Sequence, residues 1–463
     1  MSRRTNRREF IRTTTAGGLG LWVAAGHMPS LAASPNEKLN IAIVGVGGMG
    51  GSHVNDGEVK KENVVALCDI DDNSLDGASK VHPNAKRYHD FREMLDKQKD
   101  IDAVICATPD HCHAVVTAAA MRLGKHVYTQ KPLTHTVYEA HVLSKLAAAN
   151  PKLVTQMGNQ GHSNEGARQV VELVRANVVG PIREVHAWTD RPIWPQGITR
   201  PKETPDVPKH VHWDLWLGPM AYRPYNPAYL PFRWRGWWDF GTGALGDMAC
   251  HVADTAFWSL DLKHPTSIEA KSEGGNSETA PNWSIITYEF PERSGLPPVK
   301  FTWYDGKKFP PKELVEKYGI TKTFEKKVKG EDGKEKKVQE TVPGYTDNGS
   351  LLIGEKGMIY LDDAYGASYK LLPAKDFEGF KPPPKTLKRS PGHMKDWIEA
   401  IKNGGQACSN FEYASALTGM VLLGNLSIRA GKKIEWDGPN MRATNSSEVD
   451  EFIRPEYRKG WEL

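Results

Sequence analysis

The stretch Leu39-Asn-Ile-Ala-Ile-Val-Gly45-Val-Gly47-Gly48-Met49-Gly50 decides the fold of this chain. An apolar run of strand length leads directly into the pattern Gly45-x-Gly47-x-x-Gly50. A second strand-like run, Val64-Val-Ala-Leu-Cys68, ends in Asp69, nineteen residues after Gly50. A strand, a glycine-rich turn, a helix and a second strand that ends in an acid together form the fingerprint of a dinucleotide-binding sheet.

The fingerprint predicts how the nucleotide is held. The glycines let the backbone approach a pyrophosphate at a helix N-terminus, where free N–H groups and the helix dipole favour anions. Asp69 is placed to accept hydrogen bonds from the adenosine ribose hydroxyls. Its negative charge, with Asp71 and Asp72 nearby, would repel a 2′-phosphate. The sequence therefore favours NAD over NADP.

Two more strand-like runs, Asp102–Ala107 and His126–Thr129, alternate with helical segments. This alternation predicts a doubly wound parallel sheet, in which ligands bind at the carboxyl ends of the strands. The second run leads into Gln130-Lys131-Pro132. The cofactor-binding candidates at these strand ends are Gly45, Gly47, Gly48, Met49, Gly50, Asp69, Thr108, Pro109, His113, Gln130 and Lys131.

The cysteines and histidines do not predict a metal site. His111-Cys112-His113 has no distant partner cluster, and adjacent residues at a helix start point in different directions. None of the five cysteines forms a CxxC pair. An odd number of cysteines favours free buried thiols over disulfides. We expect no bound metal.

The motifs GVGGMG, CDID, ATPDHCHA and GKHVYTQKP, in this order, resemble the glucose–fructose oxidoreductase/inositol dehydrogenase family. Residues 237–254 resemble the family's second glycine-rich segment, and residues 409–437 resemble its exported, twin-arginine branch. The resemblance implies an N-terminal Rossmann domain and a C-terminal α/β domain with a large open, mainly antiparallel sheet. That sheet often forms the subunit interface, so we expect a homo-oligomer, either a dimer or a tetramer.

The resemblance also implies catalytic roles. Lys131 matches the family lysine beside the nicotinamide, and Asp247 and His251 match the acid and histidine on the substrate side. Positions 247, 251 and 254 would share one face of a helix. Where the family usually has glutamate, this chain has Gln130. Without that carboxylate, we expect Lys131 to share acid–base work with His251.

The domain organisation follows from these motifs. We assign residues 37–156 to the Rossmann domain, 157–440 to the C-terminal substrate and oligomerisation domain, and 441–463 to a tail. Residues 305–348 are rich in Lys and Glu and predict a solvated excursion. Polar candidates for sugar binding are Asp214, Arg233, Arg235 and Asp239, and Gly158–His162 is expected to line the cleft. The second domain also contains Trp188, Trp194, Trp213, Trp216, Trp234, Trp237, Trp238 and Trp258, which either pack in the core or stack on sugar rings.

Residues 1–33 have the layout of a cleavable export signal. Arg7-Arg8-Glu9-Phe10-Ile11-Arg12 resembles the twin-arginine motif. This stretch carries a net charge of +4, as does the whole chain, so the mature protein is formally neutral. Neutrality argues against nucleic-acid binding. No later apolar run approaches twenty residues, so we expect no stable membrane insertion. The sequence predicts export through the twin-arginine machinery to the periplasm.

A Rossmann protein exported after folding must take its NAD along and hold it tightly. Two chemistries fit. In the favoured one, a carbohydrate or glycoside hydroxyl is oxidised, and the bound cofactor is reoxidised by a second substrate or acceptor. In the other, a redox-neutral glycosidase oxidises the sugar, eliminates the aglycone, adds water and reduces the ketone again. A third reading is a non-catalytic NAD-binding protein, against which Lys131, Asp247 and His251 argue.

Overall fold

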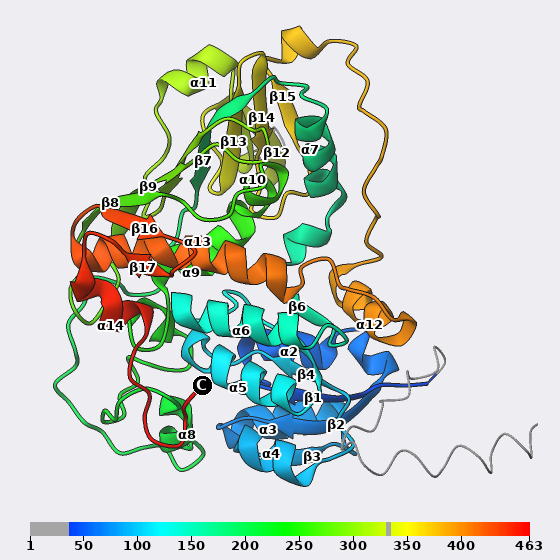
Figure 1. Ribbon diagram of the computed structural model, residues 1–463, viewed down its shortest axis with the longest axis vertical. Helices are drawn as coiled ribbons and strands as arrows, with labels where there is room; N and C mark the ends of the chain where they lie inside the picture. The colour runs from blue at the N-terminus through cyan, green and yellow to red at the C-terminus, as the bar shows by residue number, and fades with distance from the viewer. Residues whose placement is uncertain (1–36, 330–334) are drawn as a thin grey trace, which may run out of the picture. The chain divides into compact units, whose positions relative to one another are not determined.

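The computed structural model describes residues 37–329 and 335–463. The predicted signal (residues 1–33) lies outside these ranges. A six-stranded parallel sheet, ordered β3-β2-β1-β4-β5-β6, occupies the N-terminal part of the described chain (Figure 1). Its strands are β1 (Asn40–Val44), β2 (Asn63–Cys68), β3 (Lys86–Tyr88), β4 (Ala103–Cys106), β5 (His126–Thr129) and β6 (Thr155–Met157).

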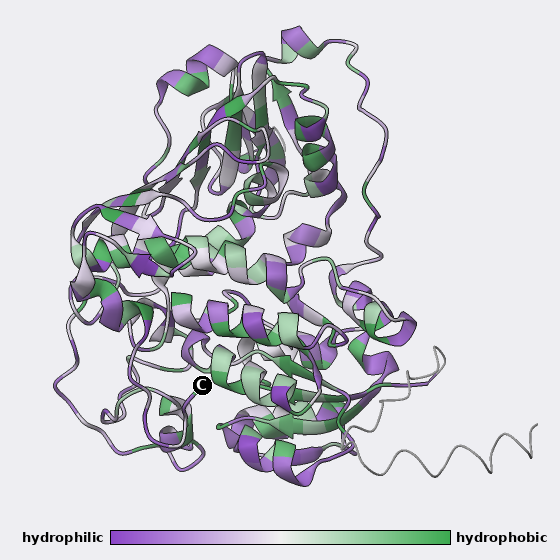
Figure 2. Ribbon diagram, viewed as in Figure 1, coloured by the Kyte–Doolittle hydropathy of each residue, from purple (hydrophilic) through white to green (hydrophobic). Residues whose placement is uncertain are grey.

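Helices alternate with these strands, as the doubly wound prediction requires. They are α2 (Gly48–Asn55), α3 (Asp72–Val81), α4 (Phe91–Lys97), α5 (Asp110–Arg122) and α6 (Val137–Ala149). Local sequence fixes their starts. Asp71 caps α3 by accepting a hydrogen bond from the Asn73 amide, and Thr136 with Glu139 forms a capping box at α6. Figure 2 shows hydrophobic residues concentrated on the strands that these helices cover.

A nine-stranded sheet, ordered β15-β14-β13-β7-β10-β9-β8-β16-β17, forms the second domain. Its pairings are antiparallel except for the parallel pair β7–β10. The predicted fold class is thus confirmed. The strands are β7 (Ile182–Trp188), β8 (Ser267–Glu273), β9 (Trp283–Phe290), β10 (Val299–Tyr304), β13 (Gly349–Gly354), β14 (Gly357–Leu361), β15 (Lys370–Leu372), β16 (Ile434–Asp437) and β17 (Arg442–Ala443).

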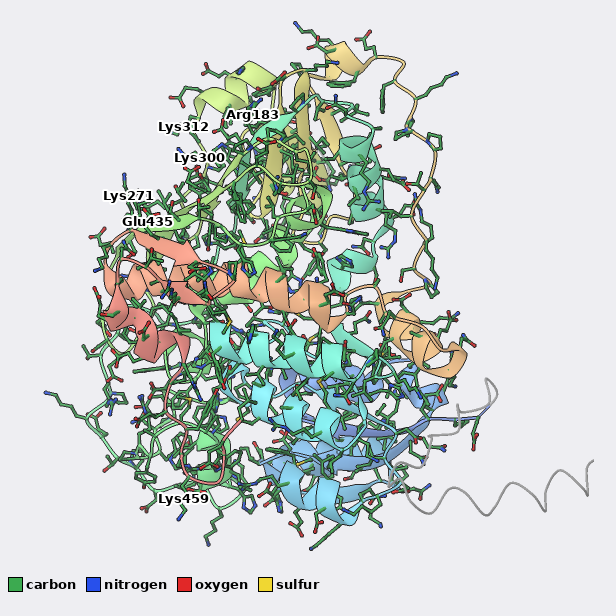
Figure 3. All side chains as sticks on the ribbon, viewed as in Figure 1. Arg183, Lys271, Lys300, Lys312, Glu435 and Lys459 are labelled. Atoms are coloured by element: carbon green, nitrogen blue, oxygen red, sulfur yellow. The ribbon has the colours of Figure 1, made fainter. Side chains whose placement is uncertain are left out.

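One face of this sheet packs on helices, and the other is partly exposed. Phe301 and Ile268 belong to the same hydrophobic cluster as residues of the covering helices. Side chains alternate along a strand, so Lys300 and Lys271 lie on the opposite face, where Figure 3 labels them. The helices of this part are α7 (Glu165–Arg175), α8 (Trp213–Leu217), α9 (Gly243–Val252), α10 (Asp254–Ser259), α12 (His393–Asn403), α13 (Phe411–Ala430) and α14 (Asp450–Ile453).

Helices α13 and α12 both connect the two domains, which lie within the compact unit Lys38–Leu463. Helix α13 packs against α6 of the first domain and against α9 and β8 of the second. Helix α12, which falls in the second domain by sequence, packs on the first sheet, where its Trp397 lies 5.7 Å from the Tyr128 ring. Sequence periodicity indicates such helices but does not reveal which sheet they cover.

The charged excursion is only partly solvated. It contains α11 (Glu313–Tyr318) and an exposed ribbon of β11 (Thr321–Lys329) and β12 (Glu335–Pro343). Tyr318, Ile320 and Tyr345 are buried in one cluster with Trp188 of β7. The excursion therefore covers part of the second sheet.

Among the described residues, no helix combines the length and hydropathy needed to cross a bilayer.

Candidate active site

A cleft of about 1040 Å³ runs along the carboxyl ends of the first sheet. Helix α9 and residues 191–235 close its other side. Ligand pockets typically measure roughly 300–1,000 Å³, so this cleft is large enough for an extended ligand and a second molecule. Asp69 and Lys131 both line it, from strands β2 and β5, which lie on opposite sides of β1 and β4. The cleft therefore has two distinct ends.

Between these ends lies the glycine loop, whose geometry excludes side chains. Gly45 has φ +79°, and a Cβ there would lie 2.6 Å from the Ala107 carbonyl oxygen. A Cβ on Gly50 would lie 1.9 Å from the oxygen of Gly45. Gly48 has φ +48° and no neighbour within 4 Å of the corresponding point. Gly45, Gly47, Gly48 and Met49 line the cleft, whereas Gly50 packs against the loop's own backbone.

Asp69 braces this loop. Its Oδ2 accepts hydrogen bonds from the amides of Val46 (2.7 Å) and Gly47 (3.3 Å), and its Oδ1 accepts from Asp71 (3.0 Å). Burial raises the pKa of Asp69, although these hydrogen bonds act in the opposite direction. The carboxylate thus holds the end of β2 to the turn that leads into α2, at the position predicted for a ribose contact.

Thr108, Pro109 and His113 also line the cleft, but His113 is held by the main chain. Its Nδ1 lies 2.7 Å from the Pro132 carbonyl oxygen and its Nε2 lies 2.8 Å from that of Thr108. Burial lowers the pKa of His113. The ring ties two strand-end loops together, so the structure gives it a positioning contact as well as a place in the cleft wall.

Gln130 contacts His53 rather than Lys131. The amide nitrogen of Gln130 lies 2.7 Å from Nε2 of His53. Burial lowers the pKa of His53 to about 4, so a neutral imidazole accepts this hydrogen bond near neutral pH. Gly158 makes room for the amide, since a Cβ there would lie 2.7 Å from the Gln130 Oε1.

Lys131 and Asp247 meet at the other end of the cleft. Lys131 Nζ donates to the Asp247 main-chain oxygen (2.9 Å) and to its Oδ1 (2.8 Å). Nε of Arg235 lies 3.1 Å from the same Oδ1, and Arg235 also pairs with the buried Asp110. Burial alone would raise the pKa of Asp247, but the charges of Lys131 and Arg235 hold it well below its usual range. Asp247 is therefore a permanent anion between two cations.

His251 lies one helical turn after Asp247 on α9 and lines the same cleft. Its Nδ1 is buried without a hydrogen-bond partner. Burial, and secondarily the Lys131 charge, lower the pKa of His251 to about 3. The low-dielectric site and the neighbouring cation both disfavour the imidazolium form. The ring of Tyr365 stands edge-on to His251, with centroids 4.9 Å apart.

Asp254 does not share the cleft with Asp247 and His251. Helix α9 ends at Val252, and Asp254 opens α10. Its carboxylate accepts a hydrogen bond from the Tyr413 hydroxyl (2.6 Å) and lies 3.1 Å from His162 Nδ1. Only Asp247 and His251 of the three predicted residues therefore lie together on one helix face. The helix is interrupted before Asp254, and Tyr413 and His162 bind that carboxylate outside the cleft.

Of the other residues predicted to bind sugar, some line the cleft and others do not. Arg235 lines the cleft, and so does Gln160 of the predicted Gly158–His162 segment. Asp214 and Asp239 instead form ion pairs with Arg458 and Arg223. Of the eight tryptophans, three line the cleft: Trp194, Trp216 and Trp234.

Among the contributors to the cleft that sequence reasoning missed are Asp110, Tyr365 and Trp461. Asp110 is fully buried beneath Arg235, Tyr365 comes from a turn held by the Asp363 carboxylate, and Trp461 comes from the last residues of the chain. Asp110 stands in the motif Pro109-Asp-His-Cys-His113, which follows a strand end, so the sequence did contain a signal for this residue. The other two stand in segments without a motif.

The structure gives His111 a main-chain role. Its ring nitrogens lie 3.2 Å from the Phe240 carbonyl oxygen and 2.8 Å from that of Trp216.

Within the described ranges, one group has ligand atoms close enough to share a metal ion: Asp72, His89 and His212, all within 4.8 Å of one another. Two of these already interact, because His89 Nε2 lies 2.7 Å from Asp72 Oδ1. The absence of a metal stays a prediction.

The residues of the cleft fit a dinucleotide. Glycines leave the cradle at the start of α2 without Cβ atoms, an acidic side chain stands at the end of β2, and the cleft continues from there to Lys131 at β5. An extended ligand with two anionic phosphates and a ribose matches this order of groups.

Comparisons with known proteins agree with this fit. A family model described as "oxidoreductase family, NAD-binding Rossmann fold" matches residues 39–157, and one described as "oxidoreductase family, C-terminal alpha/beta domain" matches residues 181–296. A glycosyl hydrolase family 109 protein of Solibacter usitatus is 31% identical over 196 residues, which cover 39% of this chain and 44% of the relative. Inositol 2-dehydrogenase of Salmonella typhimurium is 29% identical over 151 residues, which cover 32% and 45%. The chain thus matches less than half the length of these relatives.

Solved structures share the fold. The WlbA dehydrogenase from Bordetella pertussis, in complex with NADH and UDP-GlcNAcA, has a TM-score of 0.58 at 15% identity, with 87% of this chain and 98% of that chain covered. An aldose–aldose oxidoreductase from Caulobacter crescentus, complexed with glycerol, has a TM-score of 0.54 at 15% identity, with 86% and 100% covered. With both domains matched in order and the Rossmann site intact, the chain belongs to the NAD-binding glucose–fructose oxidoreductase/inositol dehydrogenase family of oxidoreductases.

Proposed function

We propose that this protein oxidises a secondary hydroxyl of a carbohydrate or glycoside with NAD as the hydride acceptor. The observation that carries the proposal is the meeting of Lys131, Asp247 and His251 at the end of β5, in the same cleft as the glycine loop. Relatives named as inositol dehydrogenases and a fold neighbour bound to a nucleotide sugar support a polyol or sugar substrate.

Each residue of this group has a defined task. The glycine loop and the end of β2 would hold NAD, which would supply the acceptor for the hydride. Lys131 has three N–H donors, and its two hydrogen bonds to Asp247 leave one for the reacting hydroxyl. Its charge stabilises the alkoxide that forms as the proton leaves. His251 lines the same cleft as a neutral imidazole whose buried Nδ1 lacks a partner, and it takes the proton that becomes acidic as the hydride leaves. Its pKa of about 3 makes it a weaker base than an ordinary histidine.

The remaining groups hold this arrangement. Asp247 fixes Lys131 and stays ionised, and Arg235 fixes Asp247 from the other side. The Arg235 guanidinium lies 4.3 Å from the centroid of Trp234, which keeps that indole at the cleft wall. Trp194, Trp234 and Tyr365 give the wall aromatic surfaces that suit the C–H faces of a sugar ring.

We further infer that NAD, rather than NADP, is bound tightly and that the folded protein is exported to the periplasm by the twin-arginine route. Asp69 and Asp71 in the cleft support the choice of NAD, because a 2′-phosphate beside them would be repelled. The basic and apolar layout of residues 1–33 supports export. A homo-oligomer built on the open face of the second sheet completes the proposal.

A second candidate is the redox-neutral glycosidase. The similarity to the Solibacter usitatus glycosyl hydrolase family 109 protein favours it. This cycle needs a further base for the carbon next to the oxidised one. Tyr365, whose ring edge meets His251, is an ionisable side chain that faces the cleft and supports this possibility.

A panel of free sugars, aryl glycosides and their aglycone-free analogues distinguishes the two. A dehydrogenase gives NADH without aglycone release, and a glycosidase releases aglycone over many turnovers without net NADH.

Lys131→Met and His251→Asn should each lower the rate by about 10²- to 10⁴-fold. Lys145→Met and His141→Asn, both on α6 and outside the cleft, are matched controls that should retain it. Full activity of the Lys131→Met enzyme would exclude the proposed mechanism.

A further inference from the structure

The C-terminal segment Arg454-Pro-Glu-Tyr-Arg-Lys-Gly-Trp-Glu-Leu463 runs from α14 to the first domain, and Figure 1 shows the chain end beside α5 and near α8. Trp461 is only 7% exposed and lines the cleft. Its neighbours in the cleft wall include Phe91, Leu215 and Trp216. An indole from the last three residues is thus part of the wall of the candidate cofactor site.

Trp461 belongs to the adenosine end of this cleft. Phe91 follows β3, the edge strand beyond β2, and its ring centroid lies 5.9 Å from that of Trp461. Asp69 at the end of β2 marks the ribose position, and Lys131 at β5 marks the opposite end. The segment therefore contacts the nucleotide half of the cleft and not the half where chemistry takes place.

Several polar contacts hold the segment in place. Arg92 donates to the Gly460 carbonyl oxygen (3.0 Å), and its guanidinium lies 4.0 Å from the Trp461 ring centroid. Arg458 donates to the carboxylate (2.6 Å) and main-chain oxygen (2.7 Å) of Asp214. The Tyr457 hydroxyl donates to Glu139 Oε1 (2.9 Å). These contacts tie the segment to three parts of the chain: α4, α8 and α6.

Residues 210–219 close the same end from the adjoining side. The Asp72 amide donates to the His210 carbonyl oxygen, and the His212 amide donates to that of Ile70, both at 2.9 Å. The Arg458 amide donates to the Pro219 carbonyl oxygen (2.9 Å). Gly218, with φ +54°, lets this loop approach α5, since a Cβ there would lie 2.7 Å from Cys112 Sγ and 3.7 Å from Trp461. The C-terminal segment thus lies against this loop.

We propose that residues 454–463 are a functional part of the NAD site: Trp461 walls the adenosine end, and NAD leaves only when this segment detaches. The inference rests on the proposed binding of NAD in this cleft. It explains how a dehydrogenase retains its cofactor, because the contacts of Arg92, Arg458 and Tyr457 all have to break before the adenosine end opens. We refer to residues 454–463 as the C-terminal latch.

The test is the rate at which the full-length mature protein releases radiolabelled NAD into an excess of unlabelled NAD. Trp461→Ala should release it at least about tenfold faster than the wild type, and Trp461→Phe should restore most of the retention. Asp214→Asn, which removes the carboxylate partner of Arg458 at the surface, should also speed release. Trp283→Ala, on β9 and outside the cleft, is the matched control and should leave the rate unchanged.

Folding and function are separated by two readouts. Thermal unfolding without NAD shows whether a variant remains folded, and Asp214→Asn carries the test if Trp461→Ala does not fold. Release at the wild-type rate by folded Trp461→Ala and Asp214→Asn proteins would overturn the proposed latch. Failure of the wild type to bind NAD at all would instead overturn the proposed function.

Discussion

Lys131 donates hydrogen bonds to both the main-chain oxygen and the carboxylate of Asp247, at 2.9 and 2.8 Å, and so joins the end of β5 to the middle of α9. The same carboxylate contacts Arg235. Asp247 is therefore shared by two cations in a largely buried place, with side-chain exposures of 12–15%, and Arg235 has a second anionic partner in Asp110. Because of this arrangement, Lys131, Arg235 and Asp247 should contribute unequally to the free energy of unfolding.

Removing the anion should cost more stability than removing one cation. Asp247→Asn takes the carboxylate partner from Lys131 and leaves it beside Arg235, which keeps Asp110. The loss of a partner from a buried pair costs about 3–5 kcal/mol. Lys131→Met leaves Asp247 paired with Arg235 and should cost less. Urea unfolding measures both changes in the free energy of unfolding.

The double variant gives the sharper result. Once Asp247 is neutral, removing the Lys131 charge relieves repulsion, so the double variant should be no less stable than Asp247→Asn alone. Simple addition of the two single losses would show that the three charges do not act as a unit.

His251 should remain neutral across the physiological range. Its pKa is lowered to about 3, first by burial and then by the Lys131 charge, so the form that accepts a proton persists far below the usual histidine pKa. Histidine NMR should show a flat His251 resonance from about pH 8 to about pH 5. In Lys131→Met the pKa of His251 should rise, because the nearby charge that lowers it most is gone. A midpoint near 6.5 in the wild type would contradict the burial argument.

Acid should destabilise the fold through its buried histidines. Burial lowers the pKa of His53, His111 and His393 to about 4 from the ordinary value of 6.5. Between these values the unfolded chain binds more protons than the folded one, so the free energy of unfolding falls as pH falls. The slope is about 1.4 kcal/mol per pH unit for each histidine.

Urea unfolding at several pH values measures this slope. His111→Asn should reduce this slope by the contribution of one histidine. Substitution of His264, whose surface is exposed but whose pKa burial also lowers, should change the slope less. An unchanged slope in His111→Asn would mean that His111 takes up its proton equally in both states.

The proposed export should depend on the second arginine pair within residues 1–33. Replacing Arg7 and Arg8 with lysines should retain the protein in the cytoplasm, because the twin-arginine pathway recognises that pair. Replacing Arg3 and Arg4 with lysines preserves the charge and is the matched control. Cell fractionation gives the answer, and equal export of both variants would argue for another route.

The sequence predicts the parts of the site that follow strand ends. Gly45–Gly50, Asp69, Thr108 and Lys131 follow the carboxyl ends of parallel strands, which converge by the geometry of the fold. Asp247 and His251 are found through the family motif and the four-residue helical spacing. Local patterns of this kind survive folding because each is set by its own strand or helix.

Other contributors depend on contacts between distant segments. Tyr365 is brought to His251 by a turn that packs on Gly161, where a Cβ would lie 2.6 Å from the Tyr365 carbonyl oxygen. Trp461 reaches the cleft through ion pairs and hydrogen bonds more than 200 residues apart in sequence. Asp254 was expected on one helix face with Asp247 and His251, but Tyr413 and His162 bind it elsewhere. Such placements follow from tertiary packing, which spacing alone does not encode.

The most direct test of the central claim uses purified mature protein without added cofactor. The protein is mixed with a panel of sugars and glycosides while the NADH absorbance band is followed, and a parallel sample is denatured and its supernatant assayed for NAD(H). We predict close to one NAD(H) per chain and the appearance of NADH with at least one carbohydrate, an appearance that Lys131→Met abolishes while its nucleotide content stays the same. Protein that carries no nucleotide, together with no NADH formation after NAD is added, would contradict the account.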